Sequence, residues 1–327
     1  MPPLPRRKSA PRITSRTGTP LAKAGLVAHP RRIIPGDTYL ITRRCSQRTF
    51  RLRPSEETNA IFAYCLALAQ AKTGVELHAV CVMSNHHHLV VTDPRGALPD
   101  FLREFHRLTA KAMNALQGQW ENLWAAEPCK VVRLATDDDV ADKIAYVAAN
   151  PVAAGLVASP REWPGLLLWG EATVAAKRPP AYFRETGTCA QELSLRIVPP
   201  PERDGQPRAP GTWERKVSAG VDARFAEARR RLGVAGRAFL GRAEVVAQSF
   251  VQRARSFEKR FGMIPTFAAK AASVRAALGR LERHFRKSYR RALMEWRSGT
   301  RTVAFPVGTW WMRVFHGATV ERADTPS

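Results

Sequence analysis

Three consecutive histidines, His86, His87 and His88, have the residue type and the spacing for metal chemistry. Apolar and β-branched residues follow at 89–92 and a turn-forming Asp-Pro-Arg-Gly run at 93–96, so the sequence predicts a β-strand here. Side chains alternate along a strand, which places His86 and His88 on one face, about 7 Å apart along the backbone, and His87 on the other. Imidazole binds divalent cations. The pair is therefore half of a candidate metal site, although a solvated strand edge or a core histidine would give the same pattern.

Tyr146, Asn150 and Pro151 form a second candidate group, in the order Tyr-x-x-x-Asn-Pro. The tyrosine and the asparagine are four residues apart, so on a helix they share one face. A phenol can act as a nucleophile on phosphorus, and the amide oxygen of an asparagine can ligate a cation that two imidazoles already hold. The alternative is a half-buried packing tyrosine, followed by an asparagine at the end of a helix that Pro151 closes.

A regular series of predicted elements positions these residues. Strands are expected at 38–42, 77–83, 86–91 and 130–134, and helices at 56–72, 98–116 and 137–150. Ser55 is expected to cap the first helix and Gly74 to end it. The order strand, helix, strand, strand, helix, strand is that of an α+β, ferredoxin-like split βαβ fold, an antiparallel sheet with helices on one face. The third helix is appended to this unit, and the histidines are expected on the open face of the sheet.

Charge is the outlying property of the composition. The chain has 327 residues, with 52 Lys and Arg against 28 Asp and Glu, a formal net charge of +24 and a pI near 11.0. This charge favours a polyanionic partner, with nucleic acid ahead of an anionic membrane surface. No apolar run is long enough to span a membrane, and the basic run at 6–8 is not followed by the apolar core of a signal peptide. The five scattered cysteines lack a Cys-x-x-Cys pair, which favours reduced thiols and a cytoplasmic protein.

Composition also divides the chain into segments. Residues 1–35 are expected to be a disordered basic arm, 36–170 the domain with both candidate groups, 171–212 a proline-rich linker and 213–327 a basic, mostly helical C-terminal extension. Within the extension, helices are expected at 225–232, 245–261 and 268–296, and a strand or hook at 303–313. Candidate nucleic-acid contacts lie near the first strand, on the second helix and in the extension: Arg43, Arg44, Arg103, Arg107, Lys111, Arg286, Lys287 and Arg290. Each of them could equally belong to a solvated face.

The two candidate groups together carry a family resemblance. Asn-His-His-His-Leu-Val-Val at 85–91, followed by Tyr-x-x-x-Asn-Pro-Val-x-Ala-Gly-Leu-Val at 146–157 and Trp-Pro at 163–164, resembles the single-strand DNA tyrosine transposases of the HUH class, and most closely their REP-associated branch. The likeness covers about 35–169 and includes the order of the elements. Either motif alone is weak, but the pair at this spacing is specific. The Phe-Pro-x-Gly-Thr-Trp-Trp run at 305–311 also resembles an extension of some bacterial members.

The resemblance implies a role for each matching residue. His86 and His88 would be metal ligands, Asn150 the third ligand, and Mg²⁺ or Mn²⁺ the ion. Tyr146 would be the nucleophile that attacks single-stranded DNA and leaves a 5′-phosphotyrosine and a free 3′-hydroxyl, so that strands are nicked and rejoined at hairpin ends. His87 departs from the family, which usually has a bulky hydrophobe there, and 165–169 departs from the family's aromatic-serine segment.

Other functions remain open on the sequence. A catalytically silent, domesticated protein that binds hairpin DNA would keep the basic surface but not need all four site residues. An RNA-binding ferredoxin-like module would need aromatic side chains on the open sheet face. A relaxase or replication initiator uses related chemistry, but the order of histidines first and tyrosine later suits a transposase better. The resemblance leaves open whether the protein works as a monomer or as a homodimer.

Overall fold

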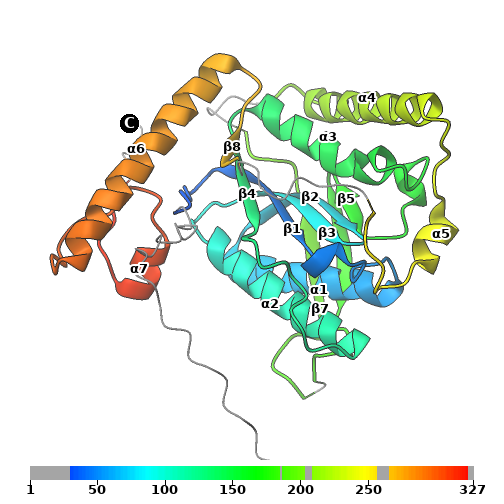
Figure 1. Cartoon of the computed structure of the whole chain (residues 1–327), viewed down its shortest axis with the longest axis horizontal. Helices are drawn as coiled ribbons and strands as arrows, with labels where there is room; N and C mark the ends of the chain where they lie inside the picture. Colours follow the sequence, from blue (N-terminus) through cyan, green and yellow to red (C-terminus); the bar gives the residue numbers. More distant parts are fainter. Residues whose placement is uncertain (1–29, 185, 203–207, 256–264, 323–327) are drawn as a thin grey trace, which may run out of the picture. The chain divides into compact units, whose positions relative to one another are not determined.

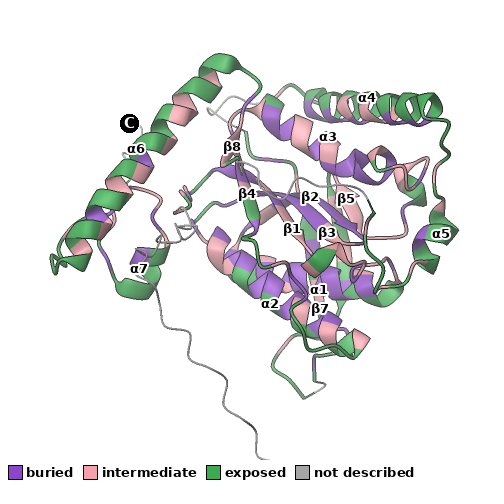
Figure 2. Cartoon of the chain, viewed as in Figure 1, coloured by how far each residue is buried: buried purple, intermediate pink, exposed green. Residues whose placement is uncertain are grey.

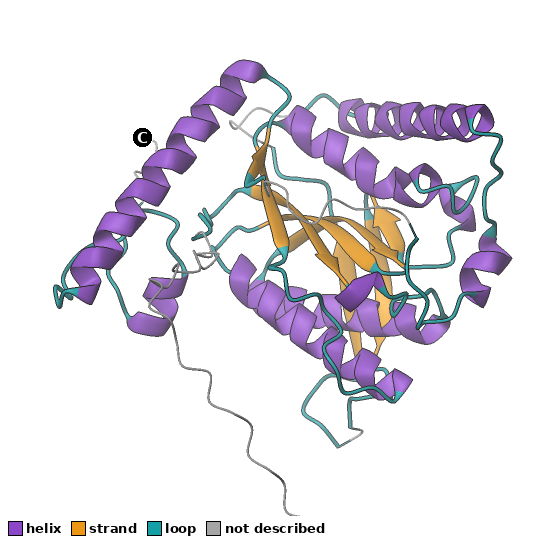
Figure 3. Ribbon diagram, in the orientation of Figure 1, coloured by secondary structure: helices purple, strands orange, loops and turns teal. Residues whose placement is uncertain are grey.

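A mixed eight-stranded β-sheet lies at the centre of the computed structural model, which describes residues 30–184, 186–202, 208–255 and 265–322. Its middle consists of the four strands expected from the sequence: β1 (Thr38–Arg44), β2 (Glu76–Met83), β3 (His86–Thr92) and β4 (Lys130–Leu134). They lie in the order β2-β3-β1-β4, and each neighbouring pair is antiparallel (Figures 1 and 3). This is the strand order of a split βαβ unit, so the predicted α+β class is confirmed.

Further strands extend both edges of this sheet. β6 (Ala172–Lys177) and β7 (Glu192–Ile197) form an antiparallel hairpin, β7 pairs in parallel with β2, and β5 (Leu167–Trp169) also pairs with β2. At the other edge, β8 (Phe267–Ala268) pairs in parallel with β4. The linker expected at 171–212 therefore contains a sheet hairpin. Leu195 and Ile197 alternate into the core and are fully buried, and this period of two outweighs the proline content around them.

Two helices cover one face of the sheet as expected. α1 (Glu56–Thr73) and α2 (Leu98–Gln117) pack there around Phe62 and Phe105, whose rings meet edge to face at 5.8 Å. Both predicted ends of α1 are confirmed. The Ser55 hydroxyl accepts the Thr58 N–H, and Gly74 ends the helix in the left-handed conformation at φ 72°.

The opposite face of the sheet is covered too, which differs from the open face that was expected. α3 (Asp137–Ala153) packs directly on β2 and β3, and α4 (Thr212–Val234) lies along the outer side of α3 (Figure 1). α3 begins with a capping box between Thr136 and Asp139, and it runs through Pro151 to Ala153 instead of closing at Asn150. Val152 is fully buried in the core between α3 and the sheet, and this packing offsets the hydrogen bond that the proline removes.

The C-terminal extension is helical but packs back on the sheet. It continues with α5 (Arg242–Ala247), α6 (Ala272–Arg297) and α7 (Trp311–His316). α5 is shorter than the helix expected at 245–261, of which 256–261 lie outside the described residues, and α6 starts later than 268 because Phe267–Ala268 join the sheet. The expected hook consists of a bridge from Phe305 to Val320 and of α7. The described residues from Arg31 onward belong to one compact unit.

Burial follows this arrangement. Figure 2 shows that buried residues concentrate in the central strands, while α4 and α6 keep long exposed surfaces. Short 3₁₀ turns at Ser46–Arg48 and Pro160–Glu162 complete the connections around the sheet. All five cysteines are free thiols, and four of them are buried, as the sequence predicts. Among the described helices, none combines the length and the apolar character needed to cross a bilayer. Of the predicted basic arm, residues 1–29 lie outside the described residues.

Candidate active site

His86 and His88 lie on the face of β3 that α3 covers. Their rings approach edge to face with centroids 4.8 Å apart. The His88 side chain is buried, with 4% of the residue exposed, and His86 is half-buried. The alternation along β3 therefore brings these two imidazoles together, as the sequence predicts.

Both imidazoles are held through Nδ1. His86 Nδ1 lies 2.6 Å from the side-chain oxygen of Asn85, an acceptor, so Nδ1 donates and Nε2 carries the lone pair. His88 Nδ1 lies 2.8 Å from the Thr42 hydroxyl on β1, which can accept in the same way. His88 Nε2 is buried and has no hydrogen-bond partner in the described structure. An imidazole that donates through Nδ1 and presents a bare Nε2 has the form of a metal-ligating histidine.

Burial keeps the His88 ring neutral. It lowers the pKa of His88 well below its usual value, and the neighbouring charges of His86, His87 and Lys130 act in the same direction. A neutral imidazole is the form that binds a cation. The buried, orphaned Nε2 therefore fits a divalent ion.

Tyr146 and Asn150 reach the same place from α3. The Tyr146 ring meets the His88 ring edge to face at 5.2 Å, and the Asn150 side chain hydrogen bonds to the phenol. Burial raises the pKa of Tyr146, while the hydrogen bond from Asn150 and the charge of Arg224 favour the phenolate. Asn150 is 7% exposed. An amide N–H that donates to the phenol leaves the amide oxygen for a cation.

A carboxylate that the sequence reading missed lies one helical turn before the tyrosine. Asp142 accepts hydrogen bonds or ion pairs from Arg224 at 2.7 Å, Lys143 at 3.0 Å and Lys270 at 3.0 Å. Partial burial opposes ionisation, but these cations together hold the pKa of Asp142 well below its usual value. Its spacing of four residues from Tyr146 was the available signal. Its partners Arg224 on α4 and Lys270 after β8 are far from it in the sequence, so no local pattern predicts these ion pairs.

His87 points to the other face, as predicted. It is fully buried against Phe62, Phe105 and Trp124, and its Nε2 lies 3.0 Å from Nε2 of His106. Burial, with the charges of Arg43 and His86, lowers the pKa of His87 to about 3, so this ring is neutral. A neutral imidazole among aromatic rings occupies the position of a core hydrophobe.

The candidate DNA contacts on β1 point in two directions. Arg43 points toward α2, where Nη1 donates to His106 Nδ1 at 3.2 Å and the guanidinium lies 5.5 Å from the Trp124 ring. It therefore lies across the sheet from His86 and His88. Arg44 is on their side, opposite His86 in the strand register, and pairs with Glu127 at 3.7 Å.

The candidate contacts on α2 and α6 also lie away from the histidines. Arg103 pairs with Asp100 and Arg107 with Glu104, while Lys111 lies over the Tyr182 ring, and all of them are on α2 across the sheet from His86 and His88. On α6, Lys287 and Arg290 are exposed and Arg286 pairs with Glu282 at 2.9 Å. The four candidate catalytic residues thus come together, while most of the candidate phosphate contacts do not join them.

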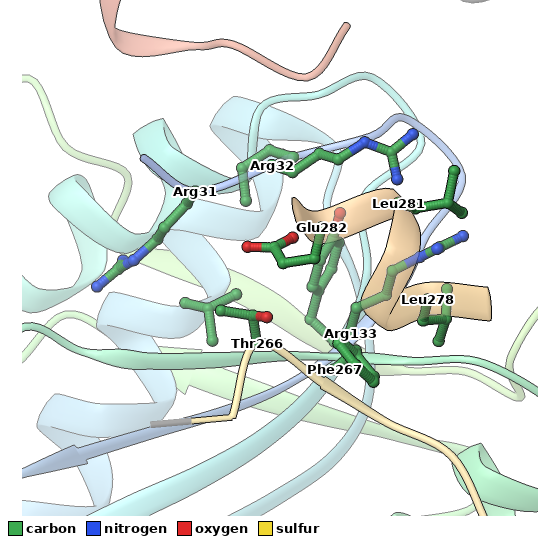
Figure 4. A pocket seen from close by; sticks show the side chains of 11 residues that line it. Arg31, Arg32, Arg133, Thr266, Phe267, Leu278, Leu281 and Glu282 are labelled. Atoms are coloured by element: carbon green, nitrogen blue, oxygen red, sulfur yellow. The ribbon is translucent and has the colours of Figure 1, made fainter. Parts of the chain in front are cut away.

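A pocket elsewhere in the fold lies between β4, β8 and α6. Arg31, Arg32, Arg133, Tyr39 and Glu282 are among the residues that line it, together with apolar side chains of α6 (Figure 4). The lining of this pocket includes none of the four candidate catalytic residues. Within the described residues, no three His, Cys, Asp or Glu side chains converge as a metal cluster, so the candidate donor set is two imidazoles and one amide.

Similar solved structures include two transposases. One is a REP-associated tyrosine transposase bound to a REP hairpin, at 21% identity over 41% of this chain and 78% of that chain, with a TM-score of 0.36. The other is a protein of Deinococcus radiodurans R1 named as a transposase, at 20% identity over 30% of this chain and 79% of that chain, with a TM-score of 0.25. At these TM-scores the similarities do not define a shared fold. No family model and no curated protein matches the chain.

Proposed function

We propose that this chain is a metal-dependent single-strand DNA transferase, a transposase of the HUH tyrosine class that nicks and rejoins DNA at hairpin ends. One observation carries the proposal. The Tyr146 ring on α3 lies 5.2 Å from the ring of His88 on β3, although 57 residues separate the two in the chain. Folding thus joins a nucleophile and an imidazole pair that the sequence motifs assign to one reaction.

In the proposed reaction the Tyr146 hydroxyl gives up its proton and its oxygen attacks the scissile phosphorus. The bond from phosphorus to the 3′ oxygen breaks, that oxygen takes up a proton, and the DNA 5′ end stays joined to Tyr146 as a phosphodiester. A 3′-hydroxyl of a second strand then attacks the same phosphorus, and the tyrosine leaves and regains its proton. Each step exchanges one phosphodiester for another, so no external energy source is needed.

The residues around the tyrosine have separate roles in this proposal. Asn150 hydrogen bonds to the phenol, and Thr42 and Asn85 orient the two imidazoles. Nε2 of His86, Nε2 of His88 and the amide oxygen of Asn150 would hold Mg²⁺ or Mn²⁺, which supplies positive charge to the scissile phosphate. His88 is buried, and the exclusion of water around it strengthens every charge interaction at the site.

A matched pair of histidine variants tests the proposal. Wild-type protein is incubated with end-labelled single-stranded oligonucleotides that contain a hairpin, in Mn²⁺ or in EDTA, and cleavage is followed on denaturing gels. His88→Ala is expected to lose cleavage by 100-fold or more, on the order of the loss of an essential ligand. His87→Leu replaces the neighbouring imidazole on the other face, and it is expected to retain cleavage at a temperature below its measured Tm.

Two results would contradict the proposal. One is cleavage by wild type that is unaffected by EDTA and by His88→Ala. The other is salt-sensitive binding of hairpin DNA with no cleavage across a broad library of hairpins. The second result would favour the catalytically silent hairpin-binding protein instead.

A further inference from the structure

Two basic side chains of the C-terminal extension reach α3 one turn before the tyrosine. Arg224 comes from α4 and Lys270 follows β8, and both contact the Asp142 carboxylate together with Lys143 of α3 itself. Asp142 and Tyr146 are four residues apart, so they share one face of the helix. Close packing at Gly220 allows this approach, because a Cβ there would lie 3.0 Å from the Cβ of Ala145.

The cations at this place outnumber the acids. Three positive charges surround the carboxylate of Asp142, and the Asp139 carboxylate, which accepts the backbone N–H of Lys270, adds a second negative charge nearby, so the excess is one. The other acidic side chains at the start of α3 have partners of their own. Asp137 pairs with Arg208, Asp138 pairs with Lys216, and Asp139 caps the helix and accepts the backbone N–H of Lys270.

The three cations also lie closer to solvent than the carboxylate between them. The Asp142 side chain is 14% exposed, against 28% for Arg224, 29% for Lys143 and 65% for Lys270. Lys143 Nζ lies 5.9 Å from the centre of the Tyr146 ring. Solvent-facing donors with an excess of positive charge, next to a candidate nucleophile, match the needs of a nucleic-acid phosphate.

We propose that Lys143, Arg224 and Lys270 bind a backbone phosphate of single-stranded DNA beside the nucleotide that Tyr146 attacks. This inference rests on the proposed function and deepens it, because it makes the C-terminal extension part of the DNA-binding site. Asp142 pairs with the three cations in the free protein and competes with the phosphate for them. The site takes a phosphodiester of the strand and reads no base.

The competing explanation is a simple tether between α3 and α4. The chain contains a matched example of such a tether, since Lys216 of α4 pairs with Asp138 of α3. This pair joins the same two helices one turn further from Tyr146. Its side chains are 46% and 64% exposed, so its carboxylate is not enclosed by cations as Asp142 is.

Salt dependence of DNA binding separates the two explanations. Affinity of full-length protein for a fluorescent single-stranded hairpin oligonucleotide is measured by anisotropy in EDTA, over a series of KCl concentrations. Each phosphate contact contributes about 0.7 to the slope of log K against log salt for single strands. The double variant Lys143→Gln with Arg224→Gln is expected to lose about 0.7 of slope, the contribution of one phosphate, and Lys216→Gln to lose none. Lys270→Gln, at the most exposed position, tests one contact without touching the pairing of α3 with α4.

Asp142→Asn gives a result of opposite sign. Without the carboxylate, the three cations no longer have a negative partner that competes with the DNA phosphate. A folded variant is therefore expected to bind DNA several-fold more tightly than wild type at equal salt. Thermal unfolding of every variant shows that it is folded at the assay temperature. The inference is overturned if the double variant keeps the wild-type slope, if Lys216→Gln loses as much, or if Asp142→Asn weakens binding.

The outcome is independent of the proposed chemistry, because binding is measured without metal and without cleavage. If the double variant loses slope but wild type forms no covalent adduct with DNA, the phosphate site is supported and the cleavage reaction is not. If wild type forms an adduct at Tyr146 but the double variant keeps the wild-type salt slope, the cleavage reaction is supported and the phosphate site is excluded.

Discussion

One hydroxyl group, that of Thr42, sets the tautomer and the ring orientation of His88. Thr42 Oγ1 lies 2.8 Å from His88 Nδ1, and the opposite nitrogen is buried without a partner in the described structure. A hydrogen bond at Nδ1 fixes the tautomer and the orientation of a ligating imidazole. Thr42 on β1 thus orients His88 on β3 for metal binding.

Replacement of that hydroxyl tests the arrangement. Thr42→Val keeps the shape of the side chain but leaves Nδ1 of His88 without its partner, and it is expected to weaken Mn²⁺ binding by about 10- to 100-fold in calorimetric titration. Thr38→Val is the matched control, since Thr38 lies on the same strand and bonds Thr92 instead. Equal Mn²⁺ affinity of Thr42→Val and wild type would show that the hydroxyl does not prepare the ligand.

A buried histidine away from the candidate site, His78, couples stability to pH. His78 Nδ1 donates to the Val198 carbonyl, and Nε2 accepts from the Thr92 hydroxyl, each at 2.8 Å. Burial lowers the pKa of His78 to about 4. The unfolded chain therefore takes up this proton near pH 6.5 while the folded protein does not, so the contribution to stability is complete above pH 6.5 and is lost as pH falls toward 4.

His78→Gln removes this titration and keeps a donor and an acceptor at the site. The difference between the ordinary and the lowered pKa corresponds to about 3 kcal/mol of unfolding free energy between pH 6.5 and pH 4. The variant is expected to lose less stability than wild type over this range in urea titrations at a series of pH values. Parallel curves for the two proteins would exclude His78 as a source of the pH dependence.

At the scale of elements, the N-terminus of α3 joins two parts of the chain. Asp139 Oδ2 accepts the Thr136 N–H in the capping box, while Oδ1 accepts the backbone N–H of Lys270. Thr136→Ala is expected to cost about 1 kcal/mol of unfolding free energy, the usual loss of an N-cap. It is also expected to raise hydrogen exchange in peptides that cover 265–271.

Ser55→Ala is the matched control for that variant. Ser55 caps α1 through the same kind of hydrogen bond, to the N–H of Thr58, and in the described structure its side chain hydrogen bonds within α1 rather than to the segment after β8. A similar loss of unfolding free energy with unchanged exchange at 265–271 is expected. Equal exchange in both variants would show that the cap does not hold that segment.

The elements themselves differ in how far the sequence predicts them. The four central strands and α1 to α3 were predicted from apolar runs of suitable length and from local start and stop signals, such as Ser55 and Gly74 at the ends of α1. The hairpin of β6 and β7 was missed because its partner strand, β2, lies about 115 residues away and its prolines suggested a linker. Coverage of the histidine face by α3 depends on the packing of α3 against β2 and β3, which no local pattern encodes.

The sequence likewise predicts some residues of the candidate site and not others. His86, His88, Tyr146 and Asn150 were predicted as a group from spacing and resemblance, and they lie together. The sequence did not predict the group around Asp142, because Arg224 and Lys270 reach this carboxylate only in the folded chain. Arg43 was predicted to contact DNA from its charge, but burial and the hydrogen bond to His106 place it on the other face.

At the scale of the whole molecule, the extension surrounds the face that carries the site. α4 packs on α3, the backbone of Leu240 and Gly241 bonds to Gly155 and Leu156, and β8 pairs with β4. The candidate site thus draws on residues from Thr42 to Lys270. With a formal net charge of +24, the chain favours a polyanionic partner.

In the proposed reaction, Tyr146 forms a covalent bond with DNA. Wild-type protein is incubated with a single-stranded hairpin oligonucleotide and Mn²⁺, digested with protease and nuclease, and analysed by tandem mass spectrometry. A nucleotide adduct on Tyr146 that is absent from Tyr146→Phe, with Tyr182 unmodified in both proteins, is the expected result. An adduct at another residue, or the same adduct yield in Tyr146→Phe, would contradict the assignment of Tyr146 as the nucleophile.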